Sequence, residues 1–473
     1  MDATPRFEVE IAQNKHLPPT GAEVHAAVTV TASGAAVPAA GVAQVIVIDT
    51  SGSMGTATKL VAAQRATLAA IDALREGALF AVVSGHTVAE MVYPPTAAMV
   101  PADAEHRRAA RRAVARLSAS GGTSMADWLD FVGLLLADHP DGVRHAILLT
   151  DGLSTQTPGE LTAAIDRAAP VFDCDARGIG ADWSPAELLR ITAALRGKAD
   201  AVRGTAELVA DFAAMTEAVM GKLVPEVRVR VQPSQWARPL FLKQTHPTDA
   251  ELLEQADGPR AVVYSTGAWG AETRRFHLAL AVERGSWDLE QDRRAAGIQV
   301  QARAVGGAFA KVSEVAAVEV RWTRNALLSS QVDPSVADFT DQRGMAEAVN
   351  RGCAAHRAGD VPGAEAAWRE AVVLAAGLGH AEMLDRLRNL VDITGDPLDG
   401  VVRARPGLTA VDMLAAVVGS SHSSSIHPVV PRARPSGPRR TRRCANPACA
   451  APENPSTAAF CGACGTALPE ETA

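Results

Sequence analysis

Residues 44–222 alternate between apolar strand patterns and helical patterns, and this alternation restricts the fold more than any other feature of the sequence. The segment opens with the near-continuous apolar run VIVID and later contains the similar run AILLTDG. Continuous apolar strands are typical of parallel sheets that helices cover on both faces. We therefore predict an α/β domain over residues 41–224, with a doubly wound, mostly parallel, Rossmann-like sheet.

The hydrophobic period changes to two on both sides of this domain, which is typical of half-buried antiparallel strands. FEVEI and EVHAAVTVT alternate before it, and about six short segments such as EVRVRV and RRFHLALAVE alternate after it. These patterns predict an all-β sandwich over residues 225–328 that is completed by N-terminal strands within residues 1–40. The α/β domain would then be inserted between the first strands of the sandwich and the rest.

The remaining sequence divides into three predicted segments by composition. Residues 329–397 are predicted to be helical, and the stretch from AAHRAG to RLRNL within them resembles one tetratricopeptide-like helix pair. Because a solenoid needs about three repeats, a small helical bundle is favoured. Residues 398–443 are predicted to form a flexible linker, rich in Ser, Pro and Arg, that cannot bury a core. The last segment, residues 444–473, holds four of the six cysteines.

The cysteines of the last segment follow the spacing C-x4-C-x11-C-x2-C, at Cys444, Cys449, Cys461 and Cys464. Four thiolates in two pairs suit tetrahedral Zn²⁺, and they favour a zinc site over disulfides or free thiols. A segment this small folds only if metal binding supplies the free energy. The pattern resembles a short zinc ribbon, although its first pair is wider than the commoner C-x2-C.

Charge and cysteine usage set expectations for compartment and partners. The net charge of −7 is too small to indicate a nucleic-acid preference for the whole molecule. Six arginines lie within residues 432–443, but no aromatic residues are interleaved with them, so a solvated linker is favoured over nucleic-acid binding. We expect no signal peptide and no membrane span. Cys174 and Cys353 are isolated and expected to be buried, and a cytoplasmic location is predicted.

Side-chain oxygens are concentrated where the strand VIVID ends. DTSGSM places Asp49, Ser51 and Ser53 in one tight loop, and ligands of open α/β sheets bind at the carboxyl ends of strands. Two further segments are predicted to reach the same edge, the loop SASGGTSM with Thr123 and the strand AILLTDG with Asp151. Hydroxyl and carboxylate oxygens are hard ligands that suit Mg²⁺. These five residues therefore predict a site for Mg²⁺ or Mn²⁺.

The set DTSGSM, GGT and LLTDG, in that order, resembles the metal-ion-dependent adhesion site of the von Willebrand factor type A (vWA) family. The resemblance covers roughly residues 43–222 and includes all five metal-site positions. It implies that the two serines and the threonine contact the cation, directly or in alternate states. It also implies that the two aspartates hold the cation mostly through water. GIGADW, after the next strand, is similar to bacterial members of the family.

Such a site favours binding over chemistry. Two carboxylates roughly balance the charge of the metal, and one coordination position stays open for an Asp or Glu carboxylate of a partner. We therefore predict a Mg²⁺-dependent protein-binding scaffold, for example in signalling, that is not an enzyme. Recognition is expected to centre on the metal and on the loops around Thr50, Met54 and Gly122. The resemblance leaves a second function open, a subunit that presents substrate to an AAA+ ATPase of the chelatase or MoxR type.

Other chemistry has less support in the sequence. A phosphoaspartate enzyme of the haloacid dehalogenase type would usually carry a second aspartate where Ser51 stands. The motifs G-x-S-x-G and H-E-x-x-H are missing, and no G-x-G-x-x-G follows the first strand of the domain. No Walker A motif occurs, so any ATP hydrolysis would come from a separate chain. Asp49 or Asp151 acting as general base on a Mg²⁺-bound water is the remaining catalytic alternative.

Overall fold

The computed structural model describes residues 5–34, 38, 41–423, 441–443 and 453–455. Contacts divide the chain into two units, Met1–Ile426 and His427–Ala473. In the second unit, strands β22 (Thr441–Arg443) and β23 (Glu453–Pro455) pair in antiparallel fashion. The four cysteines of the predicted zinc ribbon lie outside the described residues, so the ribbon stays a prediction.

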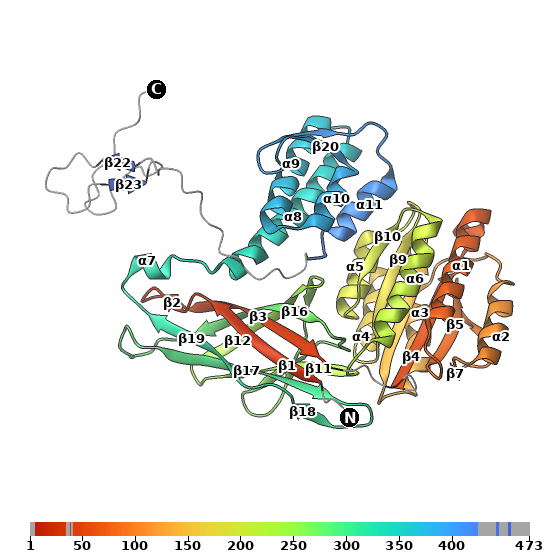
Figure 1. Cartoon of the computed structure of the whole chain (residues 1–473), viewed down its shortest axis with the longest axis horizontal. Coiled ribbons are helices and arrows are strands. Elements are labelled where there is room, and N and C mark those ends of the chain that lie inside the picture. Colours follow the sequence, from red (N-terminus) through yellow and green to blue (C-terminus); the bar gives the residue numbers. More distant parts are fainter. Residues whose placement is uncertain (1–4, 35–37, 39–40, 424–440, 444–452, 456–473) are drawn as a thin grey trace. The chain divides into compact units, whose positions relative to one another are not determined.

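A mixed seven-stranded sheet forms the centre of the α/β domain (Figure 1). Its order is β10-β9-β8-β4-β5-β6, with β7 also paired to β5. The first five strands in this order are parallel, whereas β6 and β7 run antiparallel to β5. The predicted mostly parallel α/β sheet is therefore confirmed. The strands are β4 (Val42–Asp49), β5 (Leu79–Gly85), β6 (Ala89–Tyr93), β7 (Val100–Pro101), β8 (Val143–Thr150), β9 (Asp173–Ile179) and β10 (Ala199–Val202).

Helices cover both faces of this sheet. The residues of β4 are therefore buried on both sides. Ile46 and Ile48 belong to one apolar core, whereas Val45 and Val47 belong to the other. A short 3-10 helix, η2 (Gly52–Gly55), follows β4 directly. The first core includes residues of α1 (Ala57–Ala73), α2 (Ala104–Val114) and α6 (Thr205–Met220). The second includes residues of α3 (Met125–Ala137), α4 (Pro158–Ala168) and α5 (Pro185–Ala194).

Two further sheets share a single apolar core. The first has the order β1-β3-β16-β12-β13, and all its pairs are antiparallel. Its strands are β1 (Arg6–Gln13), β3 (Glu23–Ser33), β12 (Ala237–His246), β13 (Ala250–Glu251) and β16 (Thr273–Val282). Because β3 pairs with β16, the N-terminal segment joins a sheet whose other strands follow the α/β domain in sequence.

The second of these sheets has the order β14-β15-β11-β17-β19-β2, with β18 paired to β17. Its pairs are antiparallel except for the short parallel pair of β2 and β19. Its strands are β2 (His16–Leu17), β11 (Glu226–Pro233), β14 (Glu254–Ala256), β15 (Val262–Ser265), β17 (Arg293–Arg303), β18 (Phe309–Lys311) and β19 (Ala316–Trp322). Along β11, Val227, Val229 and Val231 enter the shared core, so the residues between them face outward.

Helices dominate the last part of the first unit. They are α7 (Ala326–Ser329), α8 (Pro334–Arg357), α9 (Val361–Leu378), α10 (Ala381–Arg388) and α11 (Ala410–Gly419), with a hairpin of β20 (Val391–Thr394) and β21 (Val401–Ala404). The linker predicted over residues 398–443 is thus wrong at its start, because β21 and α11 are ordered elements within it. Thr409 and Asp412 form a capping box at the start of α11, and the helix buries Ala416 and Val418. Cys174 and Cys353 are buried and free, as expected.

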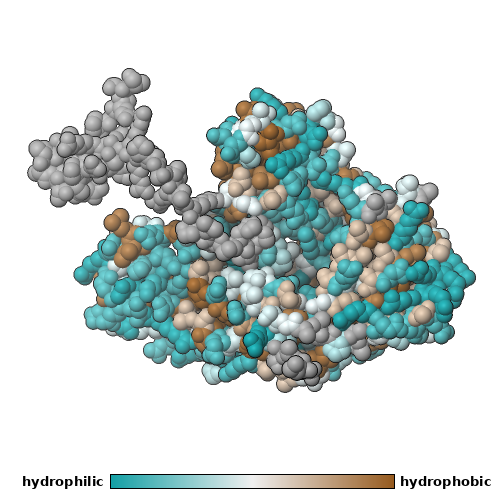
Figure 2. Space-filling model, in the orientation of Figure 1, coloured by the Kyte–Doolittle hydropathy of each residue, from teal (hydrophilic) through white to brown (hydrophobic). Residues whose placement is uncertain are grey.

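The surface of the face shown in Figure 2 has hydrophobic residues in small groups among hydrophilic ones. Scattered apolar residues of this kind are normal on soluble domains and need no partner. Among the described helices, none combines the length and the apolar character that crossing a membrane requires.

Candidate metal centre

The carboxyl ends of β4 and β8 lie side by side at one edge of the α/β sheet, because these strands are parallel neighbours. The chain passes from β4 to β5 on one side and later enters β8 on the other side. The two ends therefore flank the point where the strand order reverses, which is where open α/β sheets bind ligands. Asp49 is the last residue of β4, and Asp151 directly follows β8.

Backbone hydrogen bonds tie three loops together at this edge. Gly52 N donates to Gly121 O at 2.9 Å, which joins the loop after β4 to the loop before α3. Thr155 N donates to Thr123 O at 2.8 Å, which joins the loop before α3 to the loop after β8. The three segments that carry the predicted metal ligands therefore hold one another in place.

Asp49 is completely buried at the centre of this arrangement. Its Oδ1 accepts a hydrogen bond from Ser51 N at 2.7 Å, and its Oδ2 accepts one from Thr150 Oγ1 at 2.6 Å. Burial raises the pKa of Asp49, although the hydrogen bonds from Ser51 and Thr150 act in the opposite direction. A cation at this edge would stabilise the buried carboxylate. Thr150, which stands directly before Asp151, was not among the residues predicted from sequence.

The other predicted ligands converge on one place. Ser51 Oγ lies 3.0 Å from Ser53 Oγ, and Ser53 Oγ donates to Asp151 Oδ1 at 2.6 Å. A Cβ built on Gly152 would lie 3.0 Å from Thr123 Oγ1 and 3.5 Å from Ser53 Oγ, so these two hydroxyls flank the same small space. The fold thus brings together all five residues that the sequence singled out.

This set of oxygens fits a small divalent cation. Mg²⁺ takes six oxygen ligands at about 2.0–2.1 Å in octahedral geometry, so adjacent ligands lie about 2.9 Å apart. The 3.0 Å between the hydroxyls of Ser51 and Ser53 matches this spacing. Asp49 and Asp151 supply negative charge, and the missing side chain of Gly152 leaves the space open. Mn²⁺ prefers the same kinds of ligand.

Lys59 is a member of the site that the sequence analysis missed. Its Nζ donates to Asp151 Oδ2 at 2.6 Å and lies 3.7 Å from Asp182 Oδ2. A positive charge in the first turns of a helix opposes the helix dipole and has a cost of about 0.3–1 kcal/mol. Lys59 lies near the start of α1, so its bond to Asp151 offsets this cost. Asp151 is buried beneath this ammonium group.

The rim of the site differs in part from the expected recognition surface. Thr50 and Met54 are only 2% and 0% exposed, so these side chains cannot contact a partner. Ser53 is exposed, and Leu153, two residues after Asp151, is 58% exposed. A partner would therefore meet Ser53 and Leu153 beside the metal ligands.

The fold and the oxygen-lined edge together define a class of α/β protein with a ligand site at the strand-order reversal. A family model described as von Willebrand factor type A domain matches residues 43–201. The chain is also 37% identical to the von Willebrand factor type A protein from Catenulispora acidiphila, with a TM-score of 0.81, over 90% of this chain and 98% of that one. The chain therefore belongs to the von Willebrand factor type A family.

A more distant structure shares the fold alone. The ArnB paralog VWA2 from Sulfolobus acidocaldarius is 14% identical, with a TM-score of 0.53, over 90% of this chain and 100% of that one. No curated protein matched the chain. The similarity to both structures extends well beyond the vWA domain, since each comparison covers most of the chain.

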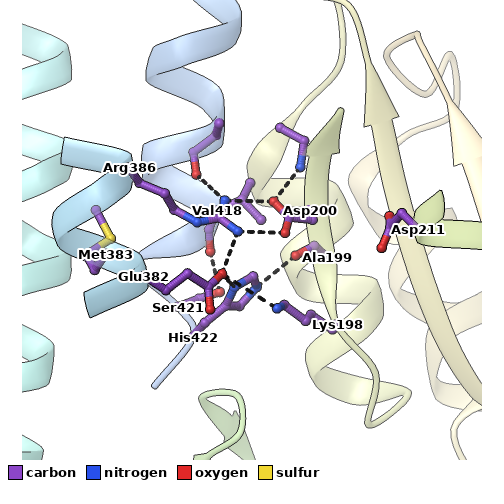
Figure 3. Close-up of polar contacts among 12 residues, drawn as sticks. Lys198, Ala199, Asp200, Asp211, Glu382, Met383, Arg386, Val418, Ser421 and His422 are labelled. Carbon is purple, nitrogen blue, oxygen red and sulfur yellow. Dashed lines mark hydrogen bonds and ion pairs between the residues drawn. The ribbon is translucent and has the colours of Figure 1, made fainter. Parts of the chain in front are cut away.

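A second group of ligand-type side chains lies between β10 and α10 (Figure 3). Ligand atoms of Asp200, Glu382 and His422 lie within 4.8 Å of one another. Arg386 already occupies this group, since it donates to the two oxygens of Asp200 at 2.8 and 2.7 Å and to Glu382 at 2.8 Å. A metal ion would have to displace this guanidinium. We therefore interpret the group as an ion-pair network that joins the helices to the vWA domain.

His422 completes this network from the segment that was predicted to be a linker. Its Nε2 lies 2.8 Å from Ala199 O, and its side chain is 2% exposed. Its main-chain oxygen in turn lies 2.9 Å from His380 Nε2. No role was predicted for His422 from sequence, because a histidine among serines shows no hydrophobic pattern.

Proposed function

We propose that this protein is a cytoplasmic, Mg²⁺-dependent protein-binding scaffold that captures a partner carboxylate at an adhesion-type metal site. The observation that supports this most is the convergence of five oxygen-bearing residues from three loops beside the exposed Ser53. Protein binding is also the general role of vWA domains. The bound ion would supply an electron-poor coordination position for an oxygen from outside.

The residues of this site would have different roles in metal binding and in partner binding. Ser51, Ser53 and Thr123 would contact the cation, while Asp49 and Asp151 would balance its charge from beneath. Leu153 would add an apolar contact beside the captured carboxylate. The two sheets with the shared core, which we interpret as a β-sandwich, would orient the vWA domain. The zinc ribbon at Cys444, Cys449, Cys461 and Cys464 would offer a second attachment point.

Partner capture from native lysate is the direct test of this proposal. The full chain with Mg²⁺ is expected to retain a specific partner that EDTA releases, and Asp49→Ala is expected to lose it. Replacing the contacting Asp or Glu of that partner with Asn or Gln should strongly weaken capture, because the neutral amide lacks the negative charge that the cation attracts. Capture that resists both EDTA and Asp49→Ala would disprove the proposal.

A subunit of an AAA+ ATPase complex is the second candidate function. It rests on the family resemblance and on the missing Walker A motif, which assigns any ATP hydrolysis to another chain. A neighbouring AAA+ gene and ATP-dependent co-purification with its product would favour this candidate. Generic phosphate and ester substrates with Mg²⁺ would test direct hydrolysis, for which we expect no activity.

Lys59 gives a prediction specific to this chain. Binding of a divalent cation must weaken the 2.6 Å bond between Lys59 and Asp151, and the ammonium also repels the metal. We expect Lys59→Met to raise the affinity for Mg²⁺ by about tenfold, since a charge-assisted hydrogen bond contributes about 1.5–3 kcal/mol. Isothermal titration calorimetry with MgCl₂ measures this change.

Arg65→Met is the matched control for Lys59→Met. It removes one positive charge from an exposed position of the same helix. Equal effects of the two substitutions would indicate a general charge effect. Weaker Mg²⁺ binding by Lys59→Met would show that the lysine helps to build the site instead of competing for it.

A further inference from the structure

A cavity of about 780 Å³ lies at the opposite end of the vWA sheet from the metal centre. Arg144, near the start of β8, lines it from the vWA domain, whereas Asp151 follows the other end of the same strand. Arg228 lines it from the outward face of β11, and Phe309 of β18 lies beside it. The cavity is therefore shared by the vWA domain and the neighbouring antiparallel sheet.

Four arginines line this cavity, and two of them are neutralised by carboxylates. Arg196 lies 2.8 Å from Asp173, and Arg303 lies 3.3 Å from Glu226. Arg144 and Arg228 differ, because within the described part of the chain neither has an ion pair or a side-chain hydrogen bond. The other charged residues that line the cavity are Asp166 and Glu251, and both are exposed.

Arg228 is held in position by an aromatic ring. Its guanidinium carbon lies 3.1 Å from the centre of the Phe309 ring, so the two planar groups are in contact. Its Nε is buried and has no hydrogen-bond partner among the described residues. Within the described residues, the guanidinium of Arg228 therefore contacts a ring face but no hydrogen-bond acceptor.

Holding these two partly buried charges without a direct ion pair among the described residues is costly. Burial lowers the pKa of both Arg144 and Arg228, although nearby acidic groups act in the opposite direction. Arginine nevertheless stays protonated at neutral pH, so its charge must be stabilised by other means. An anion in the cavity would supply the missing hydrogen-bond acceptors and the missing negative charge.

We propose that this cavity binds a small phosphate monoester, whose dianion contacts Arg144 and Arg228. Guanidinium groups match phosphate oxygens with paired hydrogen bonds, and a phosphate monoester carries about −1.5 to −2 charges at pH 7, which balances two arginines. The organic part of the ligand would pack against Leu252, Val171 and Phe309, which also line the cavity. The volume falls within the range of about 300–1,000 Å³ that is typical of small-molecule sites.

Phenyl phosphate and inorganic phosphate are suitable probes, titrated calorimetrically into the full chain. EDTA is present throughout, so that phosphate cannot bind through a cation at the metal centre. We expect saturable binding of one phenyl phosphate per chain, with weaker binding of inorganic phosphate because it lacks the apolar group. Arg144→Gln and Arg228→Gln are each expected to weaken binding by about tenfold or more.

Arg230→Gln is the matched control, since Arg230 faces the same side of β11 and pairs with Asp257 at 2.6 Å. It should bind phenyl phosphate like the unmodified chain, and so should Asp151→Asn. Arg228→Lys keeps the charge but loses the planar fork, so it should bind with intermediate affinity. Its binding would also show that a loss in Arg228→Gln is not caused by misfolding.

Three results would overturn the proposal. They are no saturable binding by the unmodified chain at millimolar probe, an equal loss in Arg230→Gln, and binding that appears only in a parallel titration with Mg²⁺ in place of EDTA. Because the site and its test are independent of the metal centre, failure here leaves the proposed scaffold function untouched, and the reverse also holds.

Discussion

Asp151→Asn is expected to lower the affinity of this protein for Mg²⁺ by about 100-fold. The side chain of Asp151 is completely buried, accepts a hydrogen bond from Ser53 and pairs with Lys59. The substitution removes one of two negative charges at the site while it preserves the shape of the side chain. Losses of 10–100-fold are typical when a residue that supports metal ligands is replaced, and the lost charge places this variant at the upper end. Calorimetric titration with MgCl₂ or MnCl₂ measures the effect.

Asp182→Asn is the matched control for Asp151→Asn. Its carboxylate also lies near Lys59, at 3.7 Å, but its side chain is 77% exposed and it belongs to none of the three loops. We expect this variant to bind Mg²⁺ within about twofold of the unmodified chain, because exposed charges interact weakly through water. If Asp151→Asn and Asp49→Asn both bound Mg²⁺ with the affinity of the unmodified chain, the proposed metal centre would be disproved.

Arg386→Met is expected to destabilise the attachment of α10 and α11 to the vWA domain by about 3–5 kcal/mol. Arg386 and Asp200 are mostly buried, with side chains 16% and 18% exposed. Removing the guanidinium leaves the Asp200 carboxylate with only its hydrogen bond from Ala201 N among the described residues, and this loss costs more than the pair contributes net. Chemical denaturation measures the loss, and hydrogen exchange within residues 381–388 and 410–419 locates it.

A control and a double variant make this prediction specific. Arg388→Met on the same helix removes an exposed pair with Asp385 and should change stability by less than about 1 kcal/mol. Asp200→Leu combined with Arg386→Met should be more stable than Arg386→Met alone, because no unpaired charge remains buried. If Arg386→Met lowered the stability as little as Arg388→Met, the ion-pair network would not be the interaction that attaches the helices to the vWA domain.

Acid should weaken the same network. Burial alone would raise the pKa of Asp200, but the hydrogen bonds and charge of Arg386 lower it from 3.8 to about 2. Because the pKa is lower in the folded state, the pair stabilises the fold fully above about pH 4, and this contribution is lost as the pH falls towards 2. Denaturation of Asp200→Asn should therefore depend less on pH between 4 and 2 than denaturation of the unmodified chain.

Much of the vWA domain could be predicted because local sequence patterns and tertiary structure agree there. The run VIVI before Asp49 is apolar at every position, and β4 is buried on both faces. Asp49, Thr123 and Asp151 could be placed together because parallel strands present their carboxyl ends at the same edge. Lys59 was missed, since a lysine at the start of a helix is usually solvated and only the fold shows that Asp151 lies beneath it.

The segment after residue 398 shows where the sequence was insufficient. Its composition of Ser, Pro and Arg indicated a linker, but α11 buries Val418 against the vWA domain. His422, four residues later, is buried by contacts with Ala199 and Glu382, which are distant in sequence. The hydrophobic periodicity of a sequence shows which apolar residues are buried, but it does not reveal the distant partners of a polar residue.

The order of strands and helices determined the class of fold from sequence alone, and the motif DTSGSM determined where a metal site is predicted. Hydrophobic period and strand-end chemistry are local properties, so they can be read along the chain. Which charges are paired depends on residues far apart in sequence. Only the tertiary structure therefore decided that Arg386 is neutralised by Asp200, whereas Arg144 and Arg228 line a cavity without an ion pair to any described residue.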